Sequence, residues 1–211
     1  MRAVVLVEGR SDQAALHALA ELLDVDLHAA SVQIRPIGGA TNIRRALADL
    51  VGPPRTPGEA RTDGALRRRE GPYVGGMCDV GEERYYSRAV AAYDGAAHLS
   101  RQELEAAGFF VCEQDLEDEL LSALGTTGMM EVLERTGDLQ AFHTFTRQPA
   151  QRDRDVTAQL HRFLGTQGGR KIAYAAELVR ALGPDRTPRP LRLALAAALT
   201  PGATSASAFG R

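Results

Sequence analysis

An unbroken apolar run at residues 3–7 stops at Glu8 and Gly9. Five residues are too few for a stable helix, and the β-branched valines favour a strand that is buried on both faces, as in the middle of a parallel sheet. Apolar residues at helical spacing follow, so Ser11 is expected to cap a helix behind this strand. We therefore expect an α/β fold with Glu8 at the carboxyl end of a central strand, where open α/β sheets bind their ligands.

Three more strands with helices between them complete the expected sheet. The strands are predicted over residues 32–37, 73–79 and 108–112, and the helices over 42–51, 82–93 and 116–124. Beyond residue 127 only helical spacing is present, over residues 129–135, 139–147, 153–164, 171–182 and 191–198. This pattern predicts a core of about four mostly parallel strands over 1–126, a helical extension packed on it over 127–199, and a flexible tail over 200–211. Residues 52–72 break every periodicity and are expected to form a long loop.

Carboxylates follow three of the four expected strands. The acids that stand at or just after these strand ends are Glu8, Asp12, Asp79, Glu82, Glu83, Asp115 and Glu117. Each of them alone could simply end a strand or complement a helix dipole. Because the carboxyl ends of parallel strands meet at one edge of a sheet, we expect these acids to converge on one crevice instead. Either Glu82 or Glu83 is expected to reach the crevice from the turn that follows the strand over residues 73–79.

So many like charges cannot lie together without a counter-ion, so a cation is expected among them. The expected ligands are oxygen atoms only, without histidine or cysteine, and such sites favour Mg²⁺ or Mn²⁺ over zinc. One or two such ions, set by carboxylates, can act as a Lewis acid and activate water in phosphoryl transfer.

Composition points to a cytoplasmic protein. No apolar stretch approaches the length of a membrane span, and the first residues lack the pattern of a signal peptide. The two cysteines, Cys78 and Cys112, lie in apolar runs and are expected to be reduced core residues. Residues 79–119 carry three arginines and eleven acids, whereas basic residues outnumber acids in 35–72 and in 140–211. This distribution suits a cation site that serves a polyanionic substrate, although solvated helix faces could produce it too.

Basic residues are almost all arginine, and Lys171 is the single lysine among 25 basic residues. A compact ammonium and a planar guanidinium do different chemistry, so a lysine kept in this background is expected to have a function that arginine cannot fill. The alternative is that this lysine has remained by chance and has no special function. The arginines that could contact a nucleic-acid backbone are Arg10, Arg67, Arg68, Arg69 and Arg170.

The spacing of these motifs resembles a known family. Glu8-Gly9 after an apolar strand, followed by Asp12 and by Asp79 at a later strand end, resembles a Toprim domain, the sheet shared by topoisomerases, primases, recombination mediators and some nucleases. The longer pattern is similar to the nuclease half of the overcoming-lysogenization-defect proteins, in the segments Glu8-Gly-Arg-Ser-Asp12, Gly38-Gly39, Asp79-Val-Gly-Glu-Glu83, Asp115-Leu-Glu117 and Lys171. The resemblance implies a Rossmann-like Toprim sheet in which Glu8, Asp12, Asp79 and Glu117 hold metal ions. It also implies catalytic roles for Glu8 and for Lys171, which would stabilise charge on the scissile phosphate.

Two features depart from the family pattern. The usual Toprim Asp-x-Asp is Asp79-Val80-Gly81 here, so Glu82 or Glu83 replaces the second aspartate or one metal is lost. No Gly-x4-Gly-Lys-[Ser/Thr] phosphate loop is present, so the family's ATPase half is missing from this sequence. The nuclease is therefore expected either to work alone or to act with an ATPase partner in trans.

The leading hypothesis is a Mg²⁺- or Mn²⁺-dependent DNA endonuclease or nickase, acting in DNA repair or phage defence and able to form a homodimer. One alternative keeps the fold and changes the reaction to nucleotidyl transfer, as in primases, but the sequence has no evident template-binding module. Another is a non-catalytic Toprim scaffold that binds DNA or partner proteins. Such scaffolds tend to lose the acids that this chain keeps.

Overall fold

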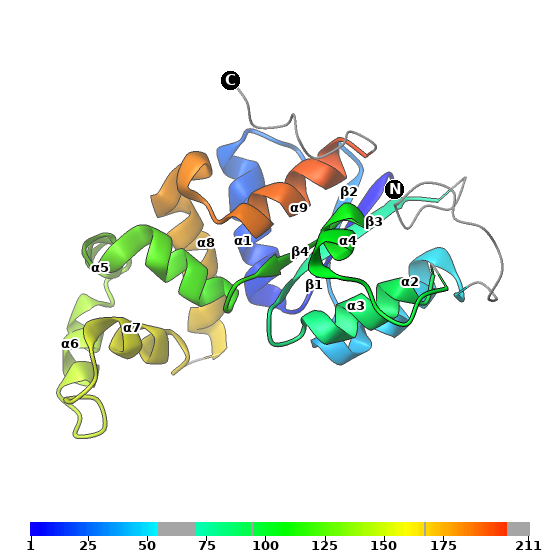
Figure 1. Cartoon of the computed structure of the whole chain (residues 1–211). Helices are drawn as coiled ribbons and strands as arrows, with labels where there is room; N and C mark the ends of the chain where they lie inside the picture. The colour runs from blue at the N-terminus through cyan, green and yellow to red at the C-terminus, as the bar shows by residue number, and fades with distance from the viewer. Residues whose placement is uncertain (55–70, 94, 167, 202–211) are drawn as a thin grey trace.

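All four predicted strands are present in the computed structural model, which describes residues 1–54, 71–93, 95–166 and 168–201 (Figure 1). The strands are β1 (Ala3–Val7), β2 (Val32–Pro36), β3 (Tyr73–Asp79) and β4 (Phe109–Cys112). They form one parallel sheet in the order β2-β1-β3-β4. The strand with the longest fully apolar run, β1, lies inside the sheet, and Ala3 pairs with Val32 on one side and with Tyr73 on the other.

Helices connect the strands and continue after them. Within the described residues they are α1 (Arg10–Leu22), α2 (Ile43–Val51), α3 (Glu83–Ala91), α4 (Arg101–Ala106), α5 (Leu116–Thr136), α6 (Leu139–Thr146), α7 (Val156–Leu164), α8 (Gly168–Arg186) and α9 (Arg189–Leu199), with a 3-10 turn η1 (Ala40–Asn42) before α2. Two of these helices are broken by a glycine in the left-handed region, α5 at Gly125 (φ 74°) and α8 at Gly183 (φ 72°).

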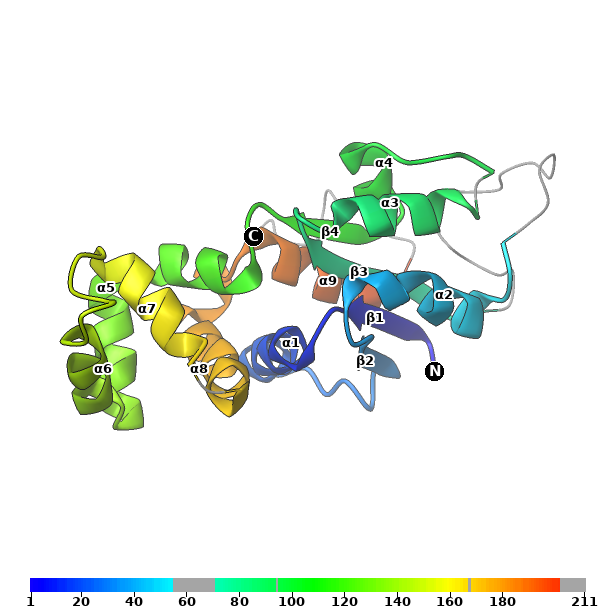
Figure 2. The ribbon, with the colours of Figure 1, turned by 90° about the horizontal axis from the view of Figure 1, so that it is seen from below.

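Both faces of the sheet are covered by helices, as the unbroken apolar strand predicts. Val5 and Val7 of β1 point into a core shared with α1, α8 and α9, whereas Val4 and Leu6 point into a second core shared with α2, α3 and α4. Figure 2 shows the sheet between these two sets of helices. The alternation follows from the period of two in a strand, which sends successive side chains to opposite faces.

The helical extension begins beyond the sheet and then returns to it. In both views α5, α6 and α7 extend from the carboxyl end of the sheet, whereas α8 packs along α1 and α9 packs against β1, β3 and β4. One hydrophobic core contains Val5 of β1 together with Phe142 of α6 and Leu178 of α8. The part predicted as an extension thus supplies α9, which lies against the sheet, and α8, which packs on α1.

Two local features differ from the sequence-based expectation. The first helix begins at Arg10, with Gly9 in the N-cap position, so Ser11 lies in the first turn and is not the cap. A carboxylate three residues into the helix does the capping instead, since the Gly9 N–H donates to Asp12 Oδ2. Helix α4 was not predicted, although Ser100 and Glu103 form a capping box there, which is a recognised sequence signature of a helix start.

Both cysteines are buried and free, as predicted, with Cys78 in one core and Cys112 in the other. In the described part of the chain, no helix is both long and apolar enough to cross a membrane. Most of the predicted loop over 52–72 and nearly all of the predicted tail over 200–211 lie outside the described residues.

A glycine lets β3 approach β1 closely. A Cβ atom on Gly76 would collide with the backbone carbonyl oxygen of Leu6 and lie 3.1 Å from its carbonyl carbon. We expect Gly76→Ala to lower the free energy of unfolding by roughly 1–3 kcal/mol, as overpacking of a core does. Denaturant unfolding would measure the change. In the control, Gly169→Ala in α8, the added Cβ meets nothing within 4 Å, so stability should be unchanged or slightly higher. Equal stability of Gly76→Ala and the wild type would contradict a strict requirement for glycine.

Candidate metal centre at the carboxyl edge of the sheet

The predicted crevice corresponds to the carboxyl edge of the sheet where the chain changes direction, and the name is kept here for the region where the acids of this edge gather. From β1 the chain passes through α1 to β2 on one side, and it later returns through α2 to β3 on the other side of β1. Connections that diverge in this way leave an opening at the carboxyl ends of the two strands between which they part. Glu8 directly follows β1 and Asp79 ends β3, so the two carboxylates flank this opening.

Three carboxylates form a compact cluster in the crevice. One oxygen atom each from Glu8, Asp79 and Glu82 lies within 4.8 Å of the others. Glu82 reaches the cluster because the chain turns after β3, where its N–H donates to the Asp79 carbonyl oxygen at 2.9 Å. Oε2 of Glu8 and Oε2 of Glu82 are buried and have no hydrogen-bond partner among the described residues. Buried oxygen atoms without a donor fit a divalent cation, which would supply the missing positive charge.

The pKa values of these acids reflect the same lack of positive charge. Burial, followed by the neighbouring Glu82 carboxyl, raises the pKa of Glu8 to about 8. Burial and then the charge of Asp12 raise the pKa of Asp79 to about 7. The pKa of Asp12 rises to about 6, chiefly through burial, although the Gly9 N–H lowers it in part. Without a cation, part of this cluster therefore remains protonated near neutral pH.

A second part of the crevice already contains a cation. Glu117, in the first turn of α5, is only 5% exposed, and its Oε2 lies 3.2 Å from Lys171 Nζ. Its other oxygen, Oε1, is buried without a hydrogen-bond partner among the residues described. Lys171 stands in the first turn of α8, and its side chain is 48% exposed, so the ammonium contacts Glu117 and also faces solvent.

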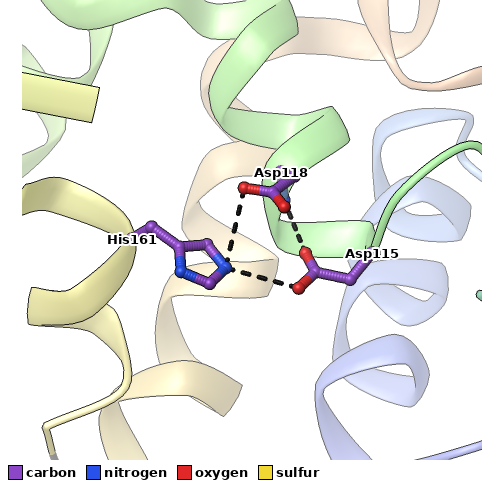
Figure 3. Close-up of side chains that lie close together, drawn as sticks. All are labelled: Asp115, Asp118 and His161. Carbon is purple, nitrogen blue, oxygen red and sulfur yellow. Dashed lines mark hydrogen bonds and ion pairs between the residues drawn. The ribbon is translucent and has the colours of Figure 1, made fainter. Parts of the chain in front are cut away.

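Asp115 lies next to a histidine that the sequence pattern did not single out. Asp115 caps α5, since the Asp118 N–H donates to Asp115 Oδ1 at 2.8 Å. Nε2 of His161, in α7, lies 3.3 Å from Asp115 Oδ2 and 3.6 Å from Asp118 Oδ1 (Figure 3). These three residues form a further group with metal-ligand spacing, on the side of the crevice formed by α5 and α7.

The two adjacent glutamates of the β3–α3 turn have different partners. Glu82 faces Glu8 and Asp79, whereas Glu83 accepts two hydrogen bonds from the Arg101 guanidinium at 2.7 and 3.2 Å. Arg101 also donates to Glu113, just after β4, at 2.7 Å. The structure thus brings Glu82 to the carboxylate cluster and holds Glu83 in an ion pair that ties the ends of β3 and β4 together.

The remaining predicted acids share the crevice. The charges of Asp12, Asp115, Glu117 and Glu82 all act to raise the pKa of Asp79, which requires that they lie near it. Of the seven acids proposed from the sequence, only Glu83 is drawn away, by Arg101.

The candidate DNA-binding arginines fall into three groups. Arg10 is exposed at the start of α1, beside the crevice. Arg170 is largely enclosed, because its guanidinium stacks over the Phe163 ring at 4.1 Å and its Nε lies 3.3 Å from Asp138 Oδ2. It therefore anchors the start of α8 and offers little free surface to DNA. The other three, Arg67, Arg68 and Arg69, lie outside the described residues.

Three residues near the site were missed from the sequence: Asp118, His161 and Arg101. Asp118 is three residues after Asp115 in a helix, a spacing that could have indicated a shared face. No sequence pattern joins His161 to an acid 46 residues earlier, because only the packing of α7 against α5 brings them together.

Comparisons with known proteins agree with this fold. Residues 1–50 match the model of the overcoming lysogenization defect protein-like TOPRIM domain. No significant match was found among curated proteins. Among solved structures, the C-terminal region of the Xanthomonas campestris pv. campestris OLD protein is 23% identical with a TM-score of 0.59, over 92% of each chain. A second structure of that region is 25% identical with a TM-score of 0.58, over 92% of this chain and 90% of that one.

The corresponding region of the Burkholderia pseudomallei OLD protein is 21% identical with a TM-score of 0.60, over 92% of this chain and 94% of that one. The similarity thus includes the helical part as well as the sheet. The chain resembles the C-terminal region of OLD proteins, with the Toprim fold over nearly its whole length and an OLD-like TOPRIM sequence in its first 50 residues.

Proposed function

We propose that the chain is a Mg²⁺- or Mn²⁺-dependent DNA endonuclease or nickase. The observation that carries the proposal is the cluster of Glu8, Asp79 and Glu82, in which two buried carboxylate oxygens have no hydrogen-bond partner within the described part of the chain. An OLD-like Toprim domain supports a nuclease-type, metal-binding enzyme in general terms. The retained acids favour catalysis over a purely scaffolding role.

Each residue has a proposed task. Glu8, Asp79 and Glu82 would hold a divalent ion, and Asp12, Asp115 and Glu117 would complete its surroundings. A bound ion at this edge would supply Lewis-acid polarisation of the phosphodiester and lower the pKa of a water molecule. Lys171, whose ammonium is half exposed beside Glu117, would stabilise the negative charge that develops on the phosphate.

The first prediction from this proposed function concerns the metal ligands. Asp79→Asn keeps the shape of the side chain and removes its charge, so we expect plasmid nicking to disappear and Mn²⁺ affinity to fall at least tenfold. The wild type should nick plasmid DNA with Mn²⁺ or Mg²⁺ and be silent in EDTA, without any effect of ATP on the isolated chain. Gel assays and isothermal titration calorimetry measure the two quantities.

The matched control is Asp49→Asn, at an exposed aspartate that pairs with Arg35 on the surface of α2. It removes the same charge away from the crevice, so cleavage and metal affinity should stay at the wild-type level. Cleavage that persists in EDTA, or in Asp79→Asn, would exclude the proposed metal centre.

The second prediction concerns pH. The pKa values of Glu8, Asp79 and Asp12 are raised to about 8, 7 and 6, so the folded metal-free chain keeps protons that the unfolded chain has lost. Stability from these groups is therefore present at about pH 4 and is lost as the pH rises to about 8. We expect the Tm in EDTA to fall over this range and excess Mg²⁺ to raise it most at the alkaline end. Asp79→Asn should flatten the profile, and a Tm that rises with pH in EDTA would contradict these assignments.

The third prediction concerns the single lysine. Lys171→Arg keeps the charge and changes its shape, so we expect single-turnover cleavage to slow at least tenfold, a barrier increase of about 1.4 kcal/mol. DNA affinity, measured in Ca²⁺, should stay nearly constant because the net charge is unchanged. Arg180→Lys is the control and should cut at the wild-type rate, because Arg180 lies on the same helix as Lys171 and pairs at the surface with Glu177 of α8 and Glu21 of α1. Full activity in Lys171→Arg would show that any cation suffices at this position.

A further inference from the structure

The crevice is divided into two parts by the way its charges are compensated. In the first part, Glu8, Asp79 and Glu82 lie within 4.8 Å of one another and two of their buried oxygens lack partners among the described residues. In the second part, Glu117 pairs with Lys171 at 3.2 Å. One group of acids thus lacks a counter-ion, while the other is served by a cation that belongs to the chain itself.

Lys171 has the properties of a built-in cation. Its ammonium is a compact point charge that can stand close to a carboxylate, where a guanidinium would need a planar approach. Glu117 is only 5% exposed, and its Oε2 lies 3.2 Å from this ammonium.

The turn after β3 carries no side chain at position 81. Position 81, where the family pattern has the second aspartate of Asp-x-Asp, is glycine, and a Cβ atom there would meet nothing within 4 Å. The turn after β3 therefore supplies one aspartate, Asp79, and Glu82 from the same turn lies with Asp79 and Glu8. A second divalent ion beside Glu117 would lack a ligand from position 81 and would have to displace Lys171.

We propose that the Lys171 ammonium takes the place of a second divalent ion and stays paired with Glu117, so that the chain binds one divalent ion, at Glu8, Asp79 and Glu82. The inference rests on the proposed metal centre. An ammonium has three N–H donors, and the lysine side chain is 48% exposed, so donors remain for a phosphodiester oxygen while Glu117 is kept neutralised. The fixed cation and the single ion would then contact the same substrate phosphate.

The test is the number of Mn²⁺ ions bound per chain, measured by equilibrium dialysis and by electron paramagnetic resonance of the free ion up to millimolar Mn²⁺. The wild type should saturate at one ion. Lys171→Met keeps the length of the side chain and removes its charge, so a second, weaker site should open and the count should rise to two. The double variant Lys171→Met with Glu117→Gln removes the carboxylate as well and should return to one.

Arg180→Met is the matched control, because it removes a cation of the same helix as Lys171 from its partners Glu177 in α8 and Glu21 in α1, and it should leave the count at one. A wild type that binds two ions of similar affinity would overturn the inference, and this measurement does not depend on the folding of any variant. If the second ion disappears in His161→Ala, it belongs to the group of Asp115, Asp118 and His161.

The outcomes separate the inference from the proposed function. A count of one in both the wild type and Lys171→Met leaves the metal centre in place and overturns only the role of Lys171 as the second cation. A count of zero in the wild type overturns the metal centre and the inference together.

Discussion

Partly buried carboxylates at the carboxyl edge of the sheet repel one another, and the surrounding structure must hold them together against this repulsion. Glu8, Asp79 and Glu82 are held within 4.8 Å of one another at the carboxyl edge of the sheet, where burial and mutual charge raise the pKa values of Glu8 and Asp79. Such an arrangement destabilises the metal-free fold, so the surrounding scaffold must hold it in place. A divalent cation bound at the proposed metal centre would relieve the repulsion, and this would couple metal binding to stability and to the release of protons.

The scaffold holds these acids on rigid elements. Glu8 and Asp79 follow neighbouring parallel strands whose approach depends on Gly76, and Arg101 joins the end of β3 to the end of β4 through Glu83 and Glu113. The guanidinium thereby fixes the turn from which Glu82 reaches the cluster. Side chains set by strands and ion pairs keep their geometry better than side chains on free loops, as a metal centre requires.

The helical part of the chain completes the same site. Helix α8 packs along α1 and against α5, and the contact with α5 brings Lys171 to Glu117 although the two residues are far apart in the sequence. Arg170, next to Lys171, is fixed by Phe163 and Asp138, so the start of α8 is anchored on both sides. The crevice therefore combines strand ends from the sheet with the first turns of α5 and α8, and it forms only when both parts of the chain are folded together.

The sequence by itself determined the four parallel strands and the edge at which the acids gather, because apolar runs and strand-terminal carboxylates are local patterns. Tertiary structure alone decided that Glu82 enters the cluster and Glu83 does not, since the choice depends on Arg101 reaching the turn from another helix. It also decided that Arg170 is enclosed and that His161 meets Asp115. Such pairings join residues that are distant in the sequence. Local spacing does not encode them, because they depend on how the helices pack against one another.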